Sequence, residues 1–143
     1  MLATGSLSDR GFTLIEALVV IAITALLAGL MFPRLQGVVT GQEFRTARSQ
    51  LILGVREARA LAIRSGSPAS FRIGGSGRDF SIGNNAGRDL PSSVRLRIAK
   101  QSNMVTFYAD GTSDGGRIAL RGRDQQQEFI VFPTTGLIVE AQR

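Results

Sequence analysis

Residues Arg10 to Glu16 read Arg-Gly-Phe-Thr-Leu-Ile-Glu, and they open an apolar run that extends from Phe12 to Phe32. Only Thr13, Glu16 and Thr24 interrupt this run. As a helix its 21 residues would extend roughly 30 Å, which is about the thickness of a hydrocarbon core. The sequence therefore predicts a membrane-spanning helix with a carboxylate near its start.

A secretory signal or a buried core helix would also contain an apolar run, but both fit this sequence less well. A cleaved secretory signal has a shorter apolar region and an Ala-x-Ala cleavage pattern close behind it, which this chain lacks. A buried core helix, apolar on every side, is rarely enclosed by a chain this short. We therefore expect a span over residues 12–33, in contact with lipid.

The stretch Gly11-Phe12-Thr13-Leu14-Ile15-Glu16, followed by an apolar helix, resembles the type III signal of type IV pilins and type II secretion pseudopilins. The resemblance implies that residues 1–11 are a leader. A prepilin peptidase would cut between Gly11 and Phe12 on the cytoplasmic side of the inner membrane, and the new amino terminus, Phe12, would be N-methylated. It also implies that the remainder of the chain lies in the periplasm.

Glu16 is the costly residue of the span, because a carboxylate in apolar surroundings needs a partner. The resemblance implies that the partner is the free amino group of Phe12 on a neighbouring subunit. Alternatively, Glu16 lies close enough to the membrane surface to reach the lipid head groups.

Residues 34–65 are predicted to continue the helix as an amphipathic segment, because apolar residues recur at spacings of three, four and seven. The positions in this pattern, all apolar except Gln42, are Leu35, Val38, Val39, Gln42, Leu51, Val55, Ala58, Leu61 and Ala62. Arginines between them form either a solvated face or a basic binding stripe: Arg45, Arg48, Arg56 and Arg59. Gly29 to Pro33 is the stretch where the helix is expected to bend or melt in a filament, since proline removes a backbone donor.

Residues 66–143 change to short strand-like segments separated by glycine-rich turns. The predicted strands are Ser70–Ile73, Asp79–Ile82, Val94–Ile98, Met104–Tyr108, Ile118–Arg121, Glu128–Phe132 and Leu137–Glu140. The sequence therefore predicts an α+β fold with an antiparallel β-rich head on the carboxy-terminal half of a long helix, and the resemblance implies that this fold is pilin-like.

The head carries a second set of motifs, beginning with Phe107-Tyr108-Ala109-Asp110-Gly111 and ending with Thr135-Gly136-Leu137-Ile138-Val139. They resemble the H-type minor pseudopilins and the related FimT-type minor pilins. The resemblance implies a structural subunit near the tip of the periplasmic pseudopilus of a type II secretion system. Its implied partners are the other major and minor pseudopilins, the prepilin peptidase and the inner-membrane assembly platform, with membrane lipid before assembly.

The alternative is a FimT-type minor type IV pilin that helps to assemble a pilus or binds DNA for uptake. DNA-binding members carry Gly-Arg-x-Arg near the carboxy terminus, whereas here Gly136 is followed by Leu137. The nearest substitute is Arg121-Gly122-Arg123, followed by Asp124. DNA is therefore a partner only in the alternative, through Arg121 and Arg123.

Composition argues against an enzyme. The chain has neither His nor Cys, so it cannot form a Ser-His or Cys-His pair or a histidine-based zinc site. Asp110 and Asp114 could offer oxygens to calcium, but two carboxylates among turn residues are more often solvated. We therefore expect no catalytic residue, metal or cofactor. The net charge of +6 permits nucleic acid as a partner and equally permits acidic sister subunits.

The amino-terminal motif predicts the mass of the mature protein. The chain extracted from membranes should begin at Phe12 and carry one added methyl group, which intact-mass measurement detects directly. An uncut chain from cells with an active prepilin peptidase, or a cut at another bond, would contradict the family assignment.

Overall fold

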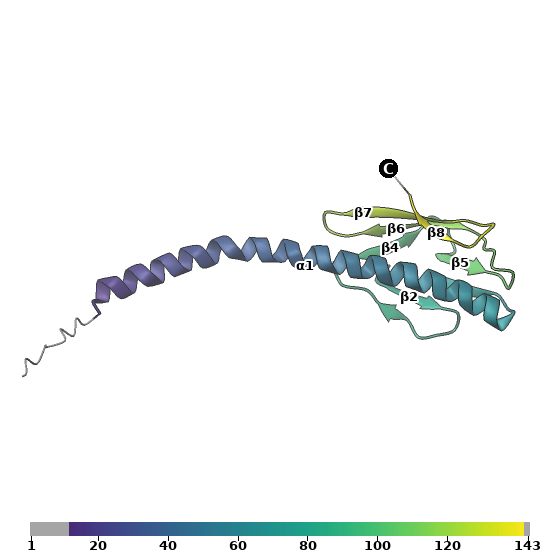
Figure 1. The fold of residues 1–143 in the computed structure, drawn as a ribbon, viewed down its shortest axis with the longest axis horizontal. Helices are drawn as coiled ribbons and strands as arrows, with labels where there is room; N and C mark the ends of the chain where they lie inside the picture. Colours follow the sequence, from purple (N-terminus) through teal and green to yellow (C-terminus); the bar gives the residue numbers. More distant parts are fainter. Residues whose placement is uncertain (1–11, 142–143) are drawn as a thin grey trace, which may run out of the picture. The chain divides into compact units, whose positions relative to one another are not determined.

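The computed structural model describes residues 12–141, and within residues 30–40 it describes the backbone alone. The chain divides into two compact units, Met1–Val38 and Val39–Arg143. Within the described residues, one long helix and eight strands follow each other (Figure 1): α1 (Leu14–Ser65), β1 (Ala69–Ile73), β2 (Asp79–Ile82), β3 (Arg88–Asp89), β4 (Arg95–Ile98), β5 (Met104–Phe107), β6 (Gly116–Arg121), β7 (Gln126–Val131) and β8 (Ile138–Glu140).

Helix α1 ends where local chemistry stops it. Ser65 is its last residue, and Gly66 adopts a φ of 62°, the left-handed conformation that commonly closes a helix. Pro68 follows two residues later. The predicted end near Arg64 is confirmed to within one residue.

Within the second unit, one stripe of α1 is buried. It consists of Phe44, Ala47, Leu51, Val55, Ala58 and Ala62, spaced three or four residues apart. Four of these residues were predicted, and Leu61 is partly buried beside them. Gln42 was wrongly placed on the apolar face: it is exposed, because the stripe continues through Phe44 instead. Leu35, Val38 and Val39 lie outside the described side chains.

No helix in the described part of the chain is both long enough and apolar enough to cross a membrane. The last residues of the expected span, from Leu30 on, lie outside the described side chains, so the span remains a prediction. Helix α1 continues without interruption through Gly29 and Pro33. The predicted bend there concerns a packed filament, and it too remains a prediction.

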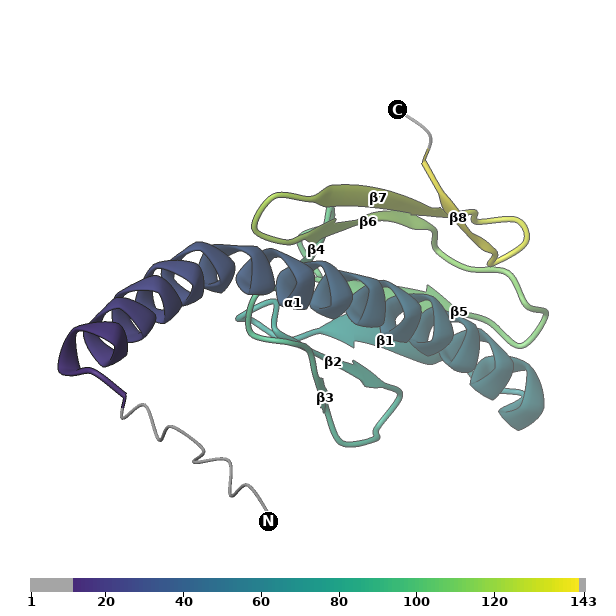
Figure 2. The ribbon, with the colours of Figure 1, turned by 60° about the vertical axis from the view of Figure 1, so that its left-hand side comes forward.

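The strands of the second unit form two antiparallel sheets. One has the order β3-β2-β1-β5 and the other β4-β6-β7-β8. In two views of the ribbon, β2 lies on one side of α1, and β6 and β7 lie on the other (Figures 1 and 2). The backbone N–H of Leu96 in β4 donates to the carbonyl of Gly77, in the hairpin between β1 and β2. This bond joins the two sheets directly.

The core fills the space between the helix stripe and the inner faces of both sheets. Burial alternates along the strands, as expected of sheets with one covered face: Phe71 and Ile73 are buried in β1, and Ile118 and Leu120 in β6. The rings of Phe71 and Phe80 lie 5.1 Å apart, centroid to centroid. The helix and the two antiparallel sheets confirm the predicted α+β class, with a β-rich head on the carboxy-terminal half of α1.

All seven predicted strands occur, with ends shifted by no more than two residues. The predicted hairpin at residues 74–77 joins β1 to β2 in antiparallel register. Strand β3 was missed because it has only two residues, Arg88 and Asp89, both exposed and charged. Its pairing with β2 leaves no hydrophobic pattern in the sequence.

Polar contacts at the edges of the sheets and in the loop before β4 join the β-rich head to α1. Arg88 makes a bidentate ion pair with Glu57, with distances of 2.8 and 2.9 Å. Arg48 donates to Glu140 at 2.7 Å, which holds the pKa of that carboxyl below its usual range. Ser93 donates to Glu43. Surface pairs of this kind contribute little stability each, so burial carries most of the free energy of folding.

Gly54 shows how closely the helix approaches a sheet. A β-carbon at this position would lie 2.7 Å from the ring of Phe80 and 3.0 Å from that of Phe71. Both rings are buried and have little room to move. Gly41, on the same helix, has no such neighbour within 4 Å.

We predict that Gly54→Ala destabilises a fragment of residues 36–143 by about 1–3 kcal/mol, because the added methyl group overpacks the core. Gly41→Ala is the matched control and should be neutral or stabilising by up to about 1 kcal/mol, since alanine favours helix. Urea unfolding measures both variants. Equal stability of the two variants would exclude close packing at Gly54.

Candidate functional site

The amino-terminal segment presents the predicted motif at the start of α1. Thr13 precedes the first helical residue, and its hydroxyl accepts a hydrogen bond from the backbone N–H of Glu16 at 3.3 Å. The carbonyl of Thr13 accepts bonds from Glu16 and Ala17 at 3.1 Å. Thr13 is therefore the N-cap. Glu16 occupies the third helical position, where its negative charge interacts favourably with the helix dipole.

This capping role was missed from the sequence, where Thr13 counted only as an interruption of the apolar run. The signal that could have found it is Thr-x-x-Glu before an apolar run, the pattern of a capping box. Glu16 thus has a role within its own helix, in addition to the predicted pairing with a neighbouring subunit.

The first turns of α1 expose a dense apolar surface. Phe12 is 73% exposed, and Leu14 is 80% exposed. Further exposed apolar side chains follow on every side of the helix: Ile15, Leu18, Val19, Val20, Ile21, Ile23, Leu26 and Leu27. A surface of this extent marks contact with lipid or with other proteins. Gly11, on the other side of the predicted cleavage, lies outside the described residues.

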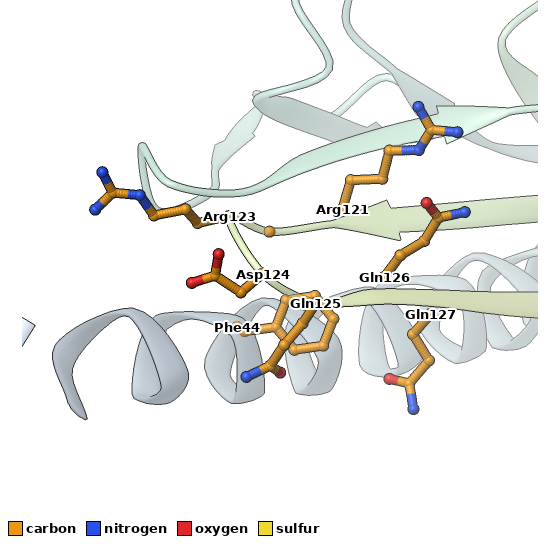
Figure 3. A pocket seen from close by; sticks show the side chains of 8 residues that line it. Phe44, Arg121, Arg123, Asp124, Gln125, Gln126 and Gln127 are labelled. Atoms are coloured by element: carbon orange, nitrogen blue, oxygen red, sulfur yellow. The ribbon is translucent and has the colours of Figure 1, made fainter. Parts of the chain in front are cut away.

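A second candidate region is the hairpin between β6 and β7. Phe44 and residues 121–127 line an open hollow of about 640 Å³ (Figure 3). Gly122 lies against Phe44, since a β-carbon on it would come within 2.8 Å of that ring. Its N–H donates to the carbonyl of Gln125 at 2.7 Å, which closes the turn.

Arg121 and Arg123 do not form the compact pair that DNA binding would use. Figure 3 shows their side chains pointing away from each other. Arg121 ends β6 and lies directly opposite Arg95 of β4. Arg123 lies in the turn, next to Asp124. The sequence could not reveal the neighbour of Arg121, because β4 and β6 are separated by another strand and a long loop.

Gly136 occupies the place where DNA-binding relatives would begin their arginine motif. It is buried, with a φ of 60°, and a β-carbon on it would lie 2.5 Å from the carbonyl oxygen of Gly111. The Nε of Arg59 donates to the same carbonyl at 3.0 Å. The predicted strand after Gly136 is present as β8. Gly136 therefore serves the packing of two loops on α1.

The two loop carboxylates considered for calcium are engaged in local hydrogen bonds. Asp110 accepts from the hydroxyl and the N–H of Thr112 at 2.6 and 2.9 Å, and these bonds lower the pKa of Asp110. Asp114 accepts from the N–H of Thr106 and pairs with Lys100. Among residues 12–141 no group of three or more acidic side chains is placed to hold a metal ion.

Comparison with known proteins decides the family. The chain is 32% identical over 135 residues to type II secretion system protein H of Xanthomonas campestris pv. campestris, covering 89% of this chain and 80% of that protein. This chain belongs to the type II secretion system protein H family. Residues 7–32 also match the prokaryotic N-terminal methylation motif, which agrees with the motif around Phe12.

Solved structures support the fold of this H-family chain. The type IV minor pilin FimU of Pseudomonas aeruginosa aligns with a TM-score of 0.60 at 18% identity, covering 71% of this chain and 90% of FimU. The minor pseudopilin EpsH of the Vibrio cholerae type 2 secretion system aligns with a TM-score of 0.55 at 15% identity, covering 69% of this chain and 96% of EpsH. At these identities the alignments show a shared pilin-like fold.

Because the side chains of Arg121 and Arg123 point away from each other, replacing both should change the affinity for DNA, and its dependence on salt, only slightly. In the fragment of residues 36–143, Arg121→Ala with Arg123→Ala should change the slope of log K against log salt by about 1 or less, whereas two joint phosphate contacts would change it by about 2. Titration of a fluorescent duplex at two salt concentrations measures this. Tight, salt-steep binding that the double variant abolishes would instead favour a DNA-uptake subunit.

Proposed function

We propose that this chain is a minor pseudopilin, a structural subunit incorporated near the tip of the periplasmic pseudopilus of a type II secretion system. The observation that carries the proposal is the 32% identity to a type II secretion system protein H over most of both chains. The methylation motif at residues 7–32 supports it, because processing by a prepilin peptidase precedes assembly in that family.

The geometry around Phe12 suits the proposed processing. Phe12 stands before the cap residue Thr13 and outside the helix, and its side chain is exposed. Cleavage after Gly11 would therefore leave α1 and its cap intact. The new amino group would emerge at the start of the helix, one turn from Glu16.

The exposed apolar turns of α1 explain how such a subunit could move from membrane to filament. Before assembly, lipid would cover these side chains, with the amino terminus on the cytoplasmic side and the head in the periplasm. An assembly platform and its ATPase would then extract the subunit, and the helices would bury one another in the filament core. Because lipid and neighbouring helices are similarly apolar, this transfer costs little hydrophobic free energy.

Glu16 would then fix the register of neighbouring helices. Its carboxylate is exposed in the single chain. On assembly it would enter apolar surroundings, where the amino group of Phe12 on the next subunit supplies the opposite charge. A Glu16 carboxylate without this partner would cost free energy in apolar surroundings, so each subunit would be held at the one axial position where the pair forms.

Replacing Glu16 tests this role. Glu16→Ala should leave membrane insertion intact or slightly improved, and it should reduce incorporation into the pseudopilus by about tenfold or more, equivalent to about 1.4 kcal/mol. Crosslinking to sister pseudopilins in cells measures incorporation, and thermal unfolding of the head should be unchanged.

Glu16→Gln is the matched control, because glutamine retains the capping-box pattern while it removes the charge. If charge pairing matters, both variants fail to assemble. Normal assembly of Glu16→Gln would show that assembly does not need the charge of Glu16, and normal assembly of both variants would remove Glu16 from the mechanism.

A further inference from the structure

The outward face of the sheet β4-β6-β7-β8 carries a concentration of arginine. Leu96, Ile98, Ile118 and Leu120 are buried on the inner face. Alternation places the residues between them on the outer face. The exposed arginines on this face, here called the arginine face, are Arg95, Arg97, Arg117 and Arg121.

Strand register makes the four arginines one cluster. Arg95 lies directly opposite Arg121, and Arg97 lies directly opposite Ala119. Side chains opposite each other on one sheet face have β-carbons about 4.5–5.5 Å apart, and diagonal neighbours about 7–8 Å apart. Ala119, half-buried and small, is therefore a direct, diagonal or same-strand neighbour of all four arginines on this sheet face.

The charge of the arginine face is not balanced within the described chain. Like charges directly opposite each other in a sheet are destabilising, which applies to Arg95 and Arg121. Glu128 is the acidic residue that register places on this face, opposite Ala119. The ion pairs found among residues 12–141 include neither Glu128 nor any of the four arginines.

An apolar strip adjoins the arginines on the same face. Arg117 lies opposite Ile130 of β7, and Ile130 lies opposite Val139 of β8. Val139 is 49% exposed. Phe132, two residues beyond Ile130, is 44% exposed. The face therefore changes from basic to apolar across the sheet.

This combination distinguishes between possible partners. A nucleic-acid backbone would neutralise the arginines and leave the apolar strip in water. A second copy of the same face would oppose arginine to arginine, which like-charge repulsion disfavours. Another protein with acidic residues beside apolar ones would satisfy both parts, and arginine is enriched at such interfaces because its guanidinium group binds carboxylates in a bidentate way.

We infer that the arginine face, together with Ile130 and Val139, is a docking surface for an acidic, partly apolar face of a different subunit of the same filament. The inference rests on the proposed function, because it specifies the chemistry of a neighbour within the pseudopilus. It also accounts for the repulsion between Arg95 and Arg121, which carboxylates on the neighbour would relieve.

The test uses the full chain in cells that assemble their own type II secretion system, with a photo-crosslinking amino acid at Ala119. Arg95→Gln with Arg121→Gln should lower the yield of crosslinks to sister pseudopilins by about tenfold or more, as expected for buried interfacial charges. The crosslinked peptide should contain more Asp and Glu than Lys and Arg. Arg72→Gln with Arg78→Gln is the control: these exposed arginines lie in β1 and just before β2, the change of charge is the same, and crosslinking should be normal.

Each failure has a separate meaning. Thermal unfolding should show that the Arg95 and Arg121 variant is as stable as wild type or more stable, which excludes misfolding as the cause of a lost crosslink. Equal yields from both double variants, or a crosslinked peptide without acidic excess, would overturn the docking surface and leave the proposed function standing. Absence of any pseudopilin crosslink or co-purification for wild type would overturn the proposed function itself. Loss of the wild-type crosslink when duplex DNA is added before irradiation would assign the arginines to nucleic acid.

Discussion

The structure depends on the burial of one narrow stripe of α1 against two sheets at once. Ala47, Ala58 and Ala62 are fully buried and small, and Gly54 lies against the ring of Phe80. Small residues let the strands come close to the helix, while Leu51 and Val55 add larger buried side chains to the same stripe. Because both inner faces are covered by one helix, each sheet keeps its outer face free for other molecules.

The same helix meets two different requirements along its length. In the second unit it is amphipathic, with one buried stripe and arginines on the remaining surface. In its first turns it is apolar on every side and exposed. The two surfaces suit the two environments of a pseudopilin: apolar side chains are stable in lipid or among other helices, and charged ones are stable in water. Glu16 is the one charged residue among residues 12–29, and the pairing proposed for it would tie the apolar surface to assembly.

The sequence was informative about the candidate sites where the chemistry is local. The motif around Phe12 is contiguous, and the match over residues 7–32 agrees with it. Closeness in sequence did not make Arg121 and Arg123 a compact pair, since their side chains leave the hairpin in different directions. Arg95 became the neighbour of Arg121 only through the register of β4 on β6. Such register is set by distant parts of the chain and leaves no mark in the spacing of residues.

By itself the sequence determined the elements whose causes are local: the end of α1 at Ser65 and Gly66, the alternating strands, the hairpin at residues 74–77 and the family motif. Turn chemistry and hydrophobic period act over a few residues, so they can be recognised in the sequence. Tertiary structure alone decided the order of the strands, the two-residue strand β3, and the gathering of four arginines around Ala119. These features arise from backbone hydrogen bonds between distant segments. Every residue except proline carries the same backbone donor and acceptor, so the sequence does not show which segments pair.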